Sequence, residues 1–130
     1  MATSLKICDL SVGDWVQDGN GIIAKVRGIE NWSDGYILNV QTVSGSICTL
    51  SVTGALPIPI TAEILEKNGF ERLLERDLFY HSESGLEVAF EDGEWMHTIN
   101  LHEYTIHTIN GVHHIQHLLR LYGCEKEINL

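Results

Sequence analysis

Three histidines late in the sequence have the spacing that points most directly to chemistry. His113 and His117 are four residues apart, so in a helix they lie one turn apart on the same face, as metal ligands can. The zinc-protease motif has a glutamate after the first histidine as general base. Here that position is His114, and no third ligand is evident downstream. Three interpretations stay open: polar surface histidines, a metal site at His113 and His117, or an organic-ligand site that includes His114.

Nucleophilic catalysis finds little support in the sequence. The G-x-S-x-G motif is absent, and Ser44-Gly45-Ser46 is typical of a hairpin turn. The three cysteines fit neither a disulfide framework nor a zinc ribbon, and we expect reduced thiols at Cys8, Cys48 and Cys124. Any of them could pair with a histidine, but spacing alone does not show it. We therefore name no catalytic residue, expect no cofactor, and favour a non-enzyme.

An exposed aromatic side chain is the best candidate for a binding contact. Trp32 lies in the predicted turn 31–35. An exposed tryptophan there is a common anchor for a peptide or a flat ligand, and the alternative is a ring packed over a barrel mouth. Tyr36 follows at the start of the next predicted strand. Trp32, Tyr36 and His114 are our predicted ligand-binding or partner-binding residues.

The chain is strongly acidic, with 18 Asp and Glu against 8 Lys and Arg and a net charge of −10. Nucleic-acid binding needs a basic face that neutralises phosphates, so we expect no direct contact with nucleic acid. The acidity provides solubility, or it provides a surface that docks on a basic partner. No membrane-spanning segment and no signal peptide are recognisable. We therefore expect a cytoplasmic protein without membrane association.

The first region that must position these residues is 1–56, which reads as short strands joined by turns. Asp18-Gly19-Asn20-Gly21 is a hairpin signal that requires positive φ. Strands are expected around Trp15 and at 22–29, 36–43 and 46–52. So many strands in so short a region predict a small closed or half-closed barrel.

The second region, 57–130, contains two predicted helices. Thr61 caps a short helix at 62–68, which ends at Gly69. A final helix begins at residue 110 or 111, continues through residue 122, and ends at Gly123. Its apolar residues have helical spacing and form a buried stripe: Val112, Ile115, Leu118, Leu119 and Tyr122.

Between these helices, alternating apolar residues predict an antiparallel meander. The expected strands are 78–81, 86–90, 94–101 and 104–109, and a short edge strand is expected at 127–130. In the third of these strands the alternation places Trp95, His97, Ile99 and Leu101 on one face.

The beginning of the chain is similar to the opening of SH3-like barrels. LSVGDWV at 10–16 fits the turn that feeds the first strand of such barrels, and GIIAKVRGI at 21–29 carries the V-x-G-I of the next strand. This resemblance implies a fold and no function.

Two motifs of the second region resemble a family of small uncharacterised proteins encoded in Bacteroidetes genomes, phages and prophages. The family pattern I-P-L-T-x-E-I-L-x-K-N-G-F is matched here at Ile58, Pro59, Thr61, Glu63, Ile64, Leu65, Lys67, Asn68, Gly69 and Phe70. The pattern V-H-x-L-Q-x-x-x-x-L is matched at Val112, His113, Gln116 and Leu121, with Ile115 where leucine is usual. The resemblance implies a phage or prophage context, in the cytoplasm of a bacterial host, and no catalytic activity.

The predicted fold is α+β and mainly β. Residues 1–56 form a small SH3-like barrel. Residues 57–130 add a helix, an antiparallel meander and a C-terminal helix, packed as one folding unit.

Three functions stay open. The first is a non-enzymatic binding protein of phage or prophage origin that engages a protein partner. The second is a counter-defence protein that sequesters a nucleotide-like small molecule at the interface of a homo-oligomer. It requires basic residues to gather from among Lys25, Arg27, Arg72, Arg76 and Arg120, or His113 and His117 to supply the hydrogen-bond donors instead. The third is a metal-dependent hydrolase that uses His113 and His117.

Overall fold

The computed structural model describes residues 5–33, 35–73 and 77–130. Within these residues the fold is α+β and mainly β, with two helices and two antiparallel sheets, which confirms the predicted class. Internal contacts divide the chain into two compact units, Met1–Ile58 (unit 1) and Pro59–Leu130 (unit 2). That the parts fold together as one unit stays a prediction.

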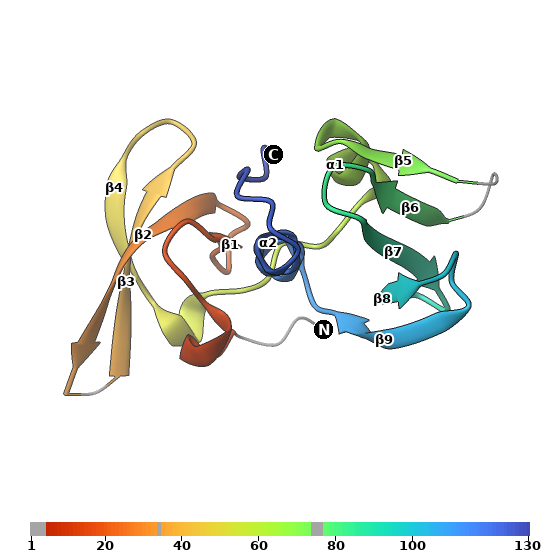
Figure 1. The fold of residues 1–130 in the computed structure, drawn as a ribbon. Helices are drawn as coiled ribbons and strands as arrows, with labels where there is room; N and C mark the ends of the chain where they lie inside the picture. Colours follow the sequence, from red (N-terminus) through yellow and green to blue (C-terminus); the bar gives the residue numbers. More distant parts are fainter. Residues whose placement is uncertain (1–4, 34, 74–76) are drawn as a thin grey trace. The chain divides into compact units, whose positions relative to one another are not determined.

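Unit 1 is a four-stranded antiparallel sheet that curls into a half-barrel (Figure 1). Its strands pair in chain order: β1 (Trp15–Gln17), β2 (Ile23–Trp32), β3 (Gly35–Thr42) and β4 (Ile47–Ser51). Two short 3-10 turns flank the sheet, η1 (Ile7–Asp9) and η2 (Val52–Gly54). A bulge between Val26 and Gly28 interrupts the regular register of β2 with β3 and increases the local bend.

The core of unit 1 lies on the inner face of this curled sheet. Alternate residues of β2 and β3 point inward, because successive side chains in a strand point to opposite faces. The buried members of this core are Leu5, Leu10, Val16, Ala24, Val26, Leu38, Val40 and Ala55. The half-barrel is therefore held by aliphatic packing.

The turns of unit 1 follow their sequence signals with one difference. Asp18 Oδ1 accepts hydrogen bonds from the backbone N–H of Asn20 (2.8 Å) and Ile22 (2.9 Å), as a hairpin aspartate is expected to do. The β2–β3 turn is tighter than the predicted turn 31–35, because β2 continues to Trp32 and pairs it with Gly35. Trp32 is therefore the last residue of a strand.

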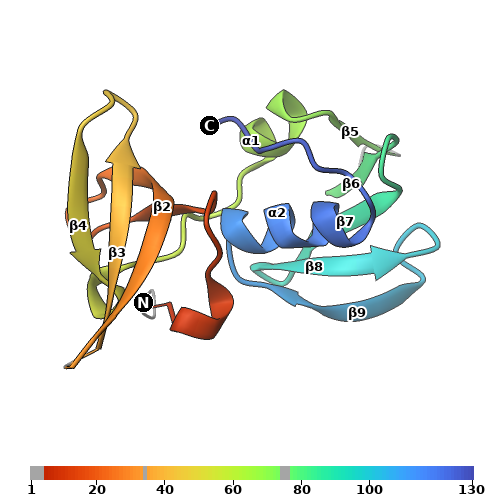
Figure 2. The ribbon, with the colours of Figure 1, turned by 60° about the vertical axis from the view of Figure 1, so that its left-hand side comes forward.

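Unit 2 is a five-stranded antiparallel meander with two helices (Figure 2). The strands pair in chain order: β5 (Phe70–Arg72), β6 (Leu78–His81), β7 (Leu86–Glu91), β8 (Glu94–Ile99) and β9 (Tyr104–Ile109). The helices are α1 (Ala62–Lys67) and α2 (Val112–Leu121). The sequence did not predict β5, because three residues are too few to show alternation. No helix among the described residues has the length and apolarity needed to cross a bilayer.

Helix α1 has the predicted cap, and α2 has a well-defined end. Thr61 Oγ1 accepts a hydrogen bond from Ile64 N at 3.2 Å. At the end of α2, Gly123 N donates to Arg120 O (3.0 Å) and Cys124 N donates to Leu119 O (2.8 Å). These two bonds form a Schellman motif, with Gly123 at φ 85°. The motif fixes the position of Cys124 relative to α2.

Residues 127–130 do not form the edge strand that the sequence predicted. The backbone of this segment is instead held by the side chain of Asn68, which follows α1. Asn68 Nδ2 donates to Asn129 O and Asn68 Oδ1 accepts from Asn129 N, both at 2.7 Å. One side-chain amide therefore makes the pair of hydrogen bonds that a neighbouring strand would make.

Strand β8 ends at Ile99, earlier than predicted, because the backbone changes conformation. Asn100, Leu101 and His102 have φ values of 56°, 55° and 70°. These values lie in the left-handed region, which residues other than glycine adopt infrequently. Leu101 therefore does not continue the face of Trp95 and His97 as the alternation predicted.

Candidate functional site

The hairpin of β2 and β3 carries the two predicted aromatic contacts. Trp32 pairs with Gly35, and Asn31 pairs with Tyr36. Trp32 and Tyr36 therefore occupy adjacent register positions, and their side chains point to opposite faces of the hairpin. Trp32 is 59% exposed and Tyr36 37% exposed. They do not form one two-ring platform, and Trp32 supplies the larger exposed aromatic surface.

This hairpin extends past the strand beside it. The pairing of β3 with β4 ends at Ile37 and Ser51, whereas the pairing of β3 with β2 continues to Trp32. The tip is therefore only two strands wide. Glu30 lies two residues before Trp32 on the same face, and Glu30 Oε2 accepts a hydrogen bond from Asn39 Nδ2 at 3.2 Å. The outer face of the tip thus combines an exposed indole with a carboxylate.

The three predicted histidines lie on α2. The rings of His113 and His117 have centroids 5.9 Å apart, and His114 lies 5.1 Å from His107 of β9. Within the described residues, no third histidine, cysteine, aspartate or glutamate joins His113 and His117 in a group of metal-site size. The metal site at these two residues stays a prediction, and the structure adds no ligand to it.

His97 of β8 is a buried, hydrogen-bonded residue, as a histidine on an apolar strand face usually is. Its Nε2 lies 2.7 Å from the hydroxyl of Tyr122, and its ring lies 5.2 Å from that of His107. Burial lowers the pKa of His97 below its ordinary value; repulsion by His107 lowers it further and Glu87 partly opposes this. The imidazole is therefore neutral at pH 7.

Sequence reasoning missed a second group in unit 2. His81, Glu83 and Cys124 each place one potential ligand atom so that all three atoms lie within 4.8 Å of one another. Within the described residues, this is the group of three or more histidine, cysteine or acidic side chains that meets the geometry of a metal site. The residues come from distant segments, so no local spacing could have revealed the group.

Local structure holds each member of this group in place. His81 is the last residue of β6, and Glu83 lies in the β6–β7 turn. The turn is held by a hydrogen bond from Gly85 N to His81 O at 2.7 Å. The Ser84 hydroxyl lies 2.7 Å from His81 Nδ1, and Ser84 N donates to the same nitrogen at 3.2 Å. Cys124 is fixed by the Schellman motif of α2.

A cavity of about 520 Å³ lies at this group. Its walls come from the end of α1, the β6–β7 turn, the last part of α2 and the segment 124–130, and include Lys67, Gly69, His81, Cys124 and Lys126. A β-carbon at Gly69 would lie 3.3 Å from Nε2 of the buried His81, so glycine at this position avoids a tight contact with the imidazole. The cavity is concave and has a few polar groups that converge on it from several segments, as small-ligand sites do.

The charges at the cavity are arranged around Glu83. Lys126 Nζ donates to Glu83 Oε2 at 3.0 Å. This hydrogen bond and the charge attraction raise the pKa of Lys126. Burial lowers the pKa of His81, while Glu83 acts in the opposite direction and Lys126 lowers it further. The group therefore presents a neutral imidazole beside an ion pair.

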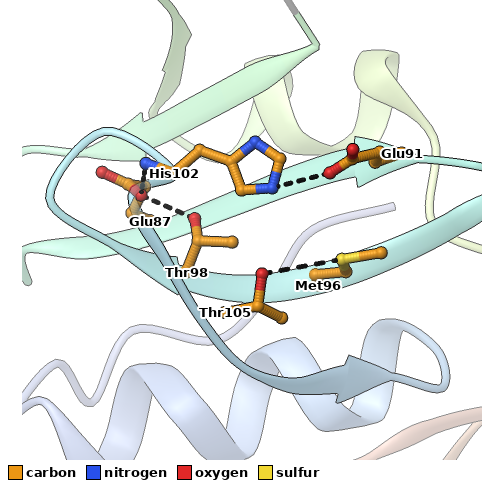
Figure 3. A network of polar contacts seen from close by, with 6 residues as sticks. All are labelled: Glu87, Glu91, Met96, Thr98, His102 and Thr105. Atoms are coloured by element: carbon orange, nitrogen blue, oxygen red, sulfur yellow. Dashed lines mark hydrogen bonds and ion pairs between the residues drawn. The ribbon is translucent and has the colours of Figure 1, made fainter.

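A second polar network in unit 2 is centred on Glu87, and it stabilises the local fold (Figure 3). The Glu87 carboxylate is buried and accepts hydrogen bonds from Thr98 Oγ1 (2.6 Å), Leu101 N (2.8 Å) and His102 N (2.8 Å). His102 Nε2 also lies 2.8 Å from Glu91 Oε2. This network holds the left-handed residues after β8, because it satisfies the amides that their conformation turns inward.

Among the described residues, the hairpin tip of unit 1 and the cavity at His81, Glu83 and Cys124 therefore have features of a binding site. The first was predicted through Trp32, and the second became visible only in three dimensions. Comparison of the chain with protein-family models, curated proteins and solved structures finds no match.

Proposed function

We propose that this protein is a non-enzymatic binding protein that engages a protein partner through the hairpin tip of unit 1. The observation that carries the proposal is the exposed indole of Trp32 at the end of a strand pair that extends past β4. Tryptophan is among the residues that most often dominate binding energy, because its large rigid ring buries much area for little lost entropy.

The chemistry of the tip favours a basic side chain on the partner. Glu30 lies on the face of Trp32, so an arginine or lysine can stack on the indole and reach the carboxylate. Unit 1 contains a similar contact in its own structure, where Lys25 Nζ lies 4.9 Å from the ring centroid of Trp15. The net charge of −10 also attracts a basic partner.

The biological setting of this proposal rests on the family resemblance alone. That resemblance implies a phage or prophage origin and the cytoplasm of a bacterial host as the setting that we propose. The partner is accordingly a protein of that host or of the phage.

The alternative of a nucleotide-sequestering protein has less support among the described residues. Lys25 lies over Trp15, and Arg27 Nε donates to Gln41 Oε1 at 2.9 Å. Arg72 pairs with Asp77 at 3.7 Å in the other unit. Arg76 lies outside the described residues. Lys25, Arg27 and Arg72 thus each have a local contact within their own unit.

The test is affinity capture from a Bacteroidetes cell lysate with the tagged full-length chain. We expect Trp32→Ala to weaken capture of the partner by about thirtyfold or more, the scale of a dominant interface residue. Glu30→Gln should weaken it less, and by an amount that falls with added salt. Val43→Ala is the matched control, because Val43 is 76% exposed but follows Thr42, the end of β3 that is far from the hairpin tip. Capture that survives Trp32→Ala, or that Val43→Ala removes equally, contradicts the proposal.

A further inference from the structure

We propose that His81, Glu83 and Cys124 form a binding site for a divalent transition-metal ion of the zinc class. This site lies entirely in unit 2 and is independent of the hairpin proposal. It also differs from the predicted pair His113 and His117. Its carrying observation is the convergence of an imidazole, a carboxylate and a thiol, with ligand atoms within 4.8 Å of one another, at the wall of a cavity.

The spacing of the ligand atoms is close to what such an ion requires. Zinc bonds to nitrogen and oxygen are about 2.0–2.2 Å and to sulfur about 2.3 Å, so tetrahedral ligand atoms lie about 3.3–3.8 Å apart. The separation in unit 2 is up to 4.8 Å. If the ligand atoms move about 1 Å closer together, their separations reach those of a tetrahedral zinc site. Glu83 can supply it, because its side chain is half exposed and lies in a turn.

The donor types select the class of ion. A thiolate with an imidazole suits zinc and its neighbours, whereas magnesium and calcium prefer sites made only of oxygen ligands. Three protein ligands leave one coordination position of a tetrahedron for water or a further ligand. The cavity of about 520 Å³ beside the group leaves room for that fourth ligand.

His81 accepts a hydrogen bond from Ser84 N at Nδ1, so it must change tautomer to act as a metal-ligating histidine through Nε2. Such residues usually donate their second ring nitrogen to an oxygen acceptor, which orients the ring. The Ser84 hydroxyl, 2.7 Å from Nδ1, can be this acceptor. A metal at Nε2 selects the tautomer with the proton on Nδ1, and the Ser84 amide then gives up its 3.2 Å contact. Gly69 keeps the Nε2 side free of a β-carbon.

A cation already lies at the carboxylate of this group. Lys126 Nζ lies 3.0 Å from Glu83 Oε2, so this carboxylate already has a positively charged partner. Both side chains are largely exposed, so this ion pair contributes little to stability and a divalent ion can displace the ammonium. The acidic residues concentrated in unit 2 add a long-range attraction for cations.

The experiment is a titration of the chelator-treated full-length protein with Zn²⁺, followed by calorimetry and native mass spectrometry. We expect one ion per chain. Cys124→Ser and His81→Asn should each weaken binding by about a hundredfold or more, since loss of an outer partner alone weakens metal sites by 10- to 100-fold. Cys48→Ser is the matched thiol control, because Cys48 is an exposed cysteine of unit 1, and it should bind as the wild type does.

Cobalt substitution tests direct ligation by the thiolate. Co²⁺ bound to Cys124 gives a sulfur-to-metal charge-transfer band in the near ultraviolet, which should persist in Cys48→Ser and vanish in Cys124→Ser. Persistence of the band in Cys124→Ser, or absence of saturable zinc binding by the wild type, overturns the proposal.

Two exposed variants keep the test decisive if a buried variant fails to fold, which circular dichroism will show. Glu83→Gln should weaken binding, because it removes a ligand without removing buried volume. Lys126→Gln should strengthen binding, because it removes the competing ammonium. If neither variant changes the affinity, Glu83 is not a ligand and the proposed site is wrong.

Discussion

Unit 1 and unit 2 are both antiparallel sheets in chain order, but they place their polar residues differently. All seven histidines and thirteen of the eighteen acidic residues lie in unit 2. Unit 1 encloses an aliphatic core and exposes one tryptophan on an extended hairpin. Among the described residues, each unit buries one carboxylate, Asp14 in unit 1 and Glu87 in unit 2, but unit 2 also buries histidines and gathers polar side chains at a cavity. A surface contact can thus come from one hairpin, whereas a polar site needs segments that are distant in sequence.

Core truncation should give the largest effects and test whether the units are energetically separate. Leu38→Ala in unit 1 and Phe79→Ala in unit 2 each remove a fully buried side chain. We expect a loss of about 3–5 kcal/mol in the free energy of unfolding from each. Hydrogen exchange measured along the chain should rise mainly in the unit that carries the change. A uniform rise in exchange over both units would instead support one folding unit and contradict the energetic separation of unit 1 and unit 2.

Loss of Glu87 should destabilise unit 2 by about 2–4 kcal/mol, because three donors lose their charged acceptor. Urea denaturation of Glu87→Ala measures this. Glu87→Gln keeps one acceptor oxygen and should fall between Glu87→Ala and the wild type. A loss in Glu87→Ala below about 0.5 kcal/mol would mean that water replaces the carboxylate without penalty.

Acid should weaken unit 2 through His97, whereas unit 1 contains no histidine. The pKa of His97 is lowered in the folded state by burial and by His107, so folding favours the neutral ring. Its contribution to stability is fully present above the unfolded pKa of about 6.5 and is lost as pH falls below that value. Each pH unit in this range costs at most about 1.4 kcal/mol. Between pH 8 and pH 5, the free energy of unfolding should fall less steeply with pH in His97→Gln than in the wild type. If the two curves of stability against pH are parallel, other groups cause the effect.

The smallest effect on stability should come from Trp32→Ala, within about 0.5 kcal/mol of the wild type. The reason is that most of the indole is exposed and β2 keeps its pairing without it. Thermal denaturation measures the change. A large loss would show that the ring packs on unit 1 and would remove the basis for a docking contact.

Most of the fold followed from local signals. Three such signals are the turn at Asp18, the helix cap at Thr61 and the helix end at Gly123. Each depends on the backbone or side chain of that one residue, so the sequence could predict it. β5 was missed because it is short. The segment 127–130 was predicted wrongly as a strand because its partner is the side chain of Asn68, which no alternation pattern reveals.

The two candidate sites also differ in how far local sequence signals could predict them. Trp32 could be singled out from its place between two strands, although its position at a strand end and the opposite direction of Tyr36 needed the register. His81 and Cys124 lie far apart in the chain and have no characteristic neighbours, so only the tertiary fold brings them together.

The three left-handed residues after β8 also constrain how this chain can change over generations. Asn100, Leu101 and His102 keep a conformation that glycine would adopt more readily, and the carboxylate of Glu87 holds two of their amides. Replacement of Glu87 in this background removes the group that secures the loop. If glycine first replaces one of these loop residues, the replacement of Glu87 costs less stability, because the loop then depends less on the carboxylate. We therefore expect glycine to enter the loop before Glu87 is replaced, and not the reverse. The effects of substitutions at Glu87 and in the loop are expected to depend on one another.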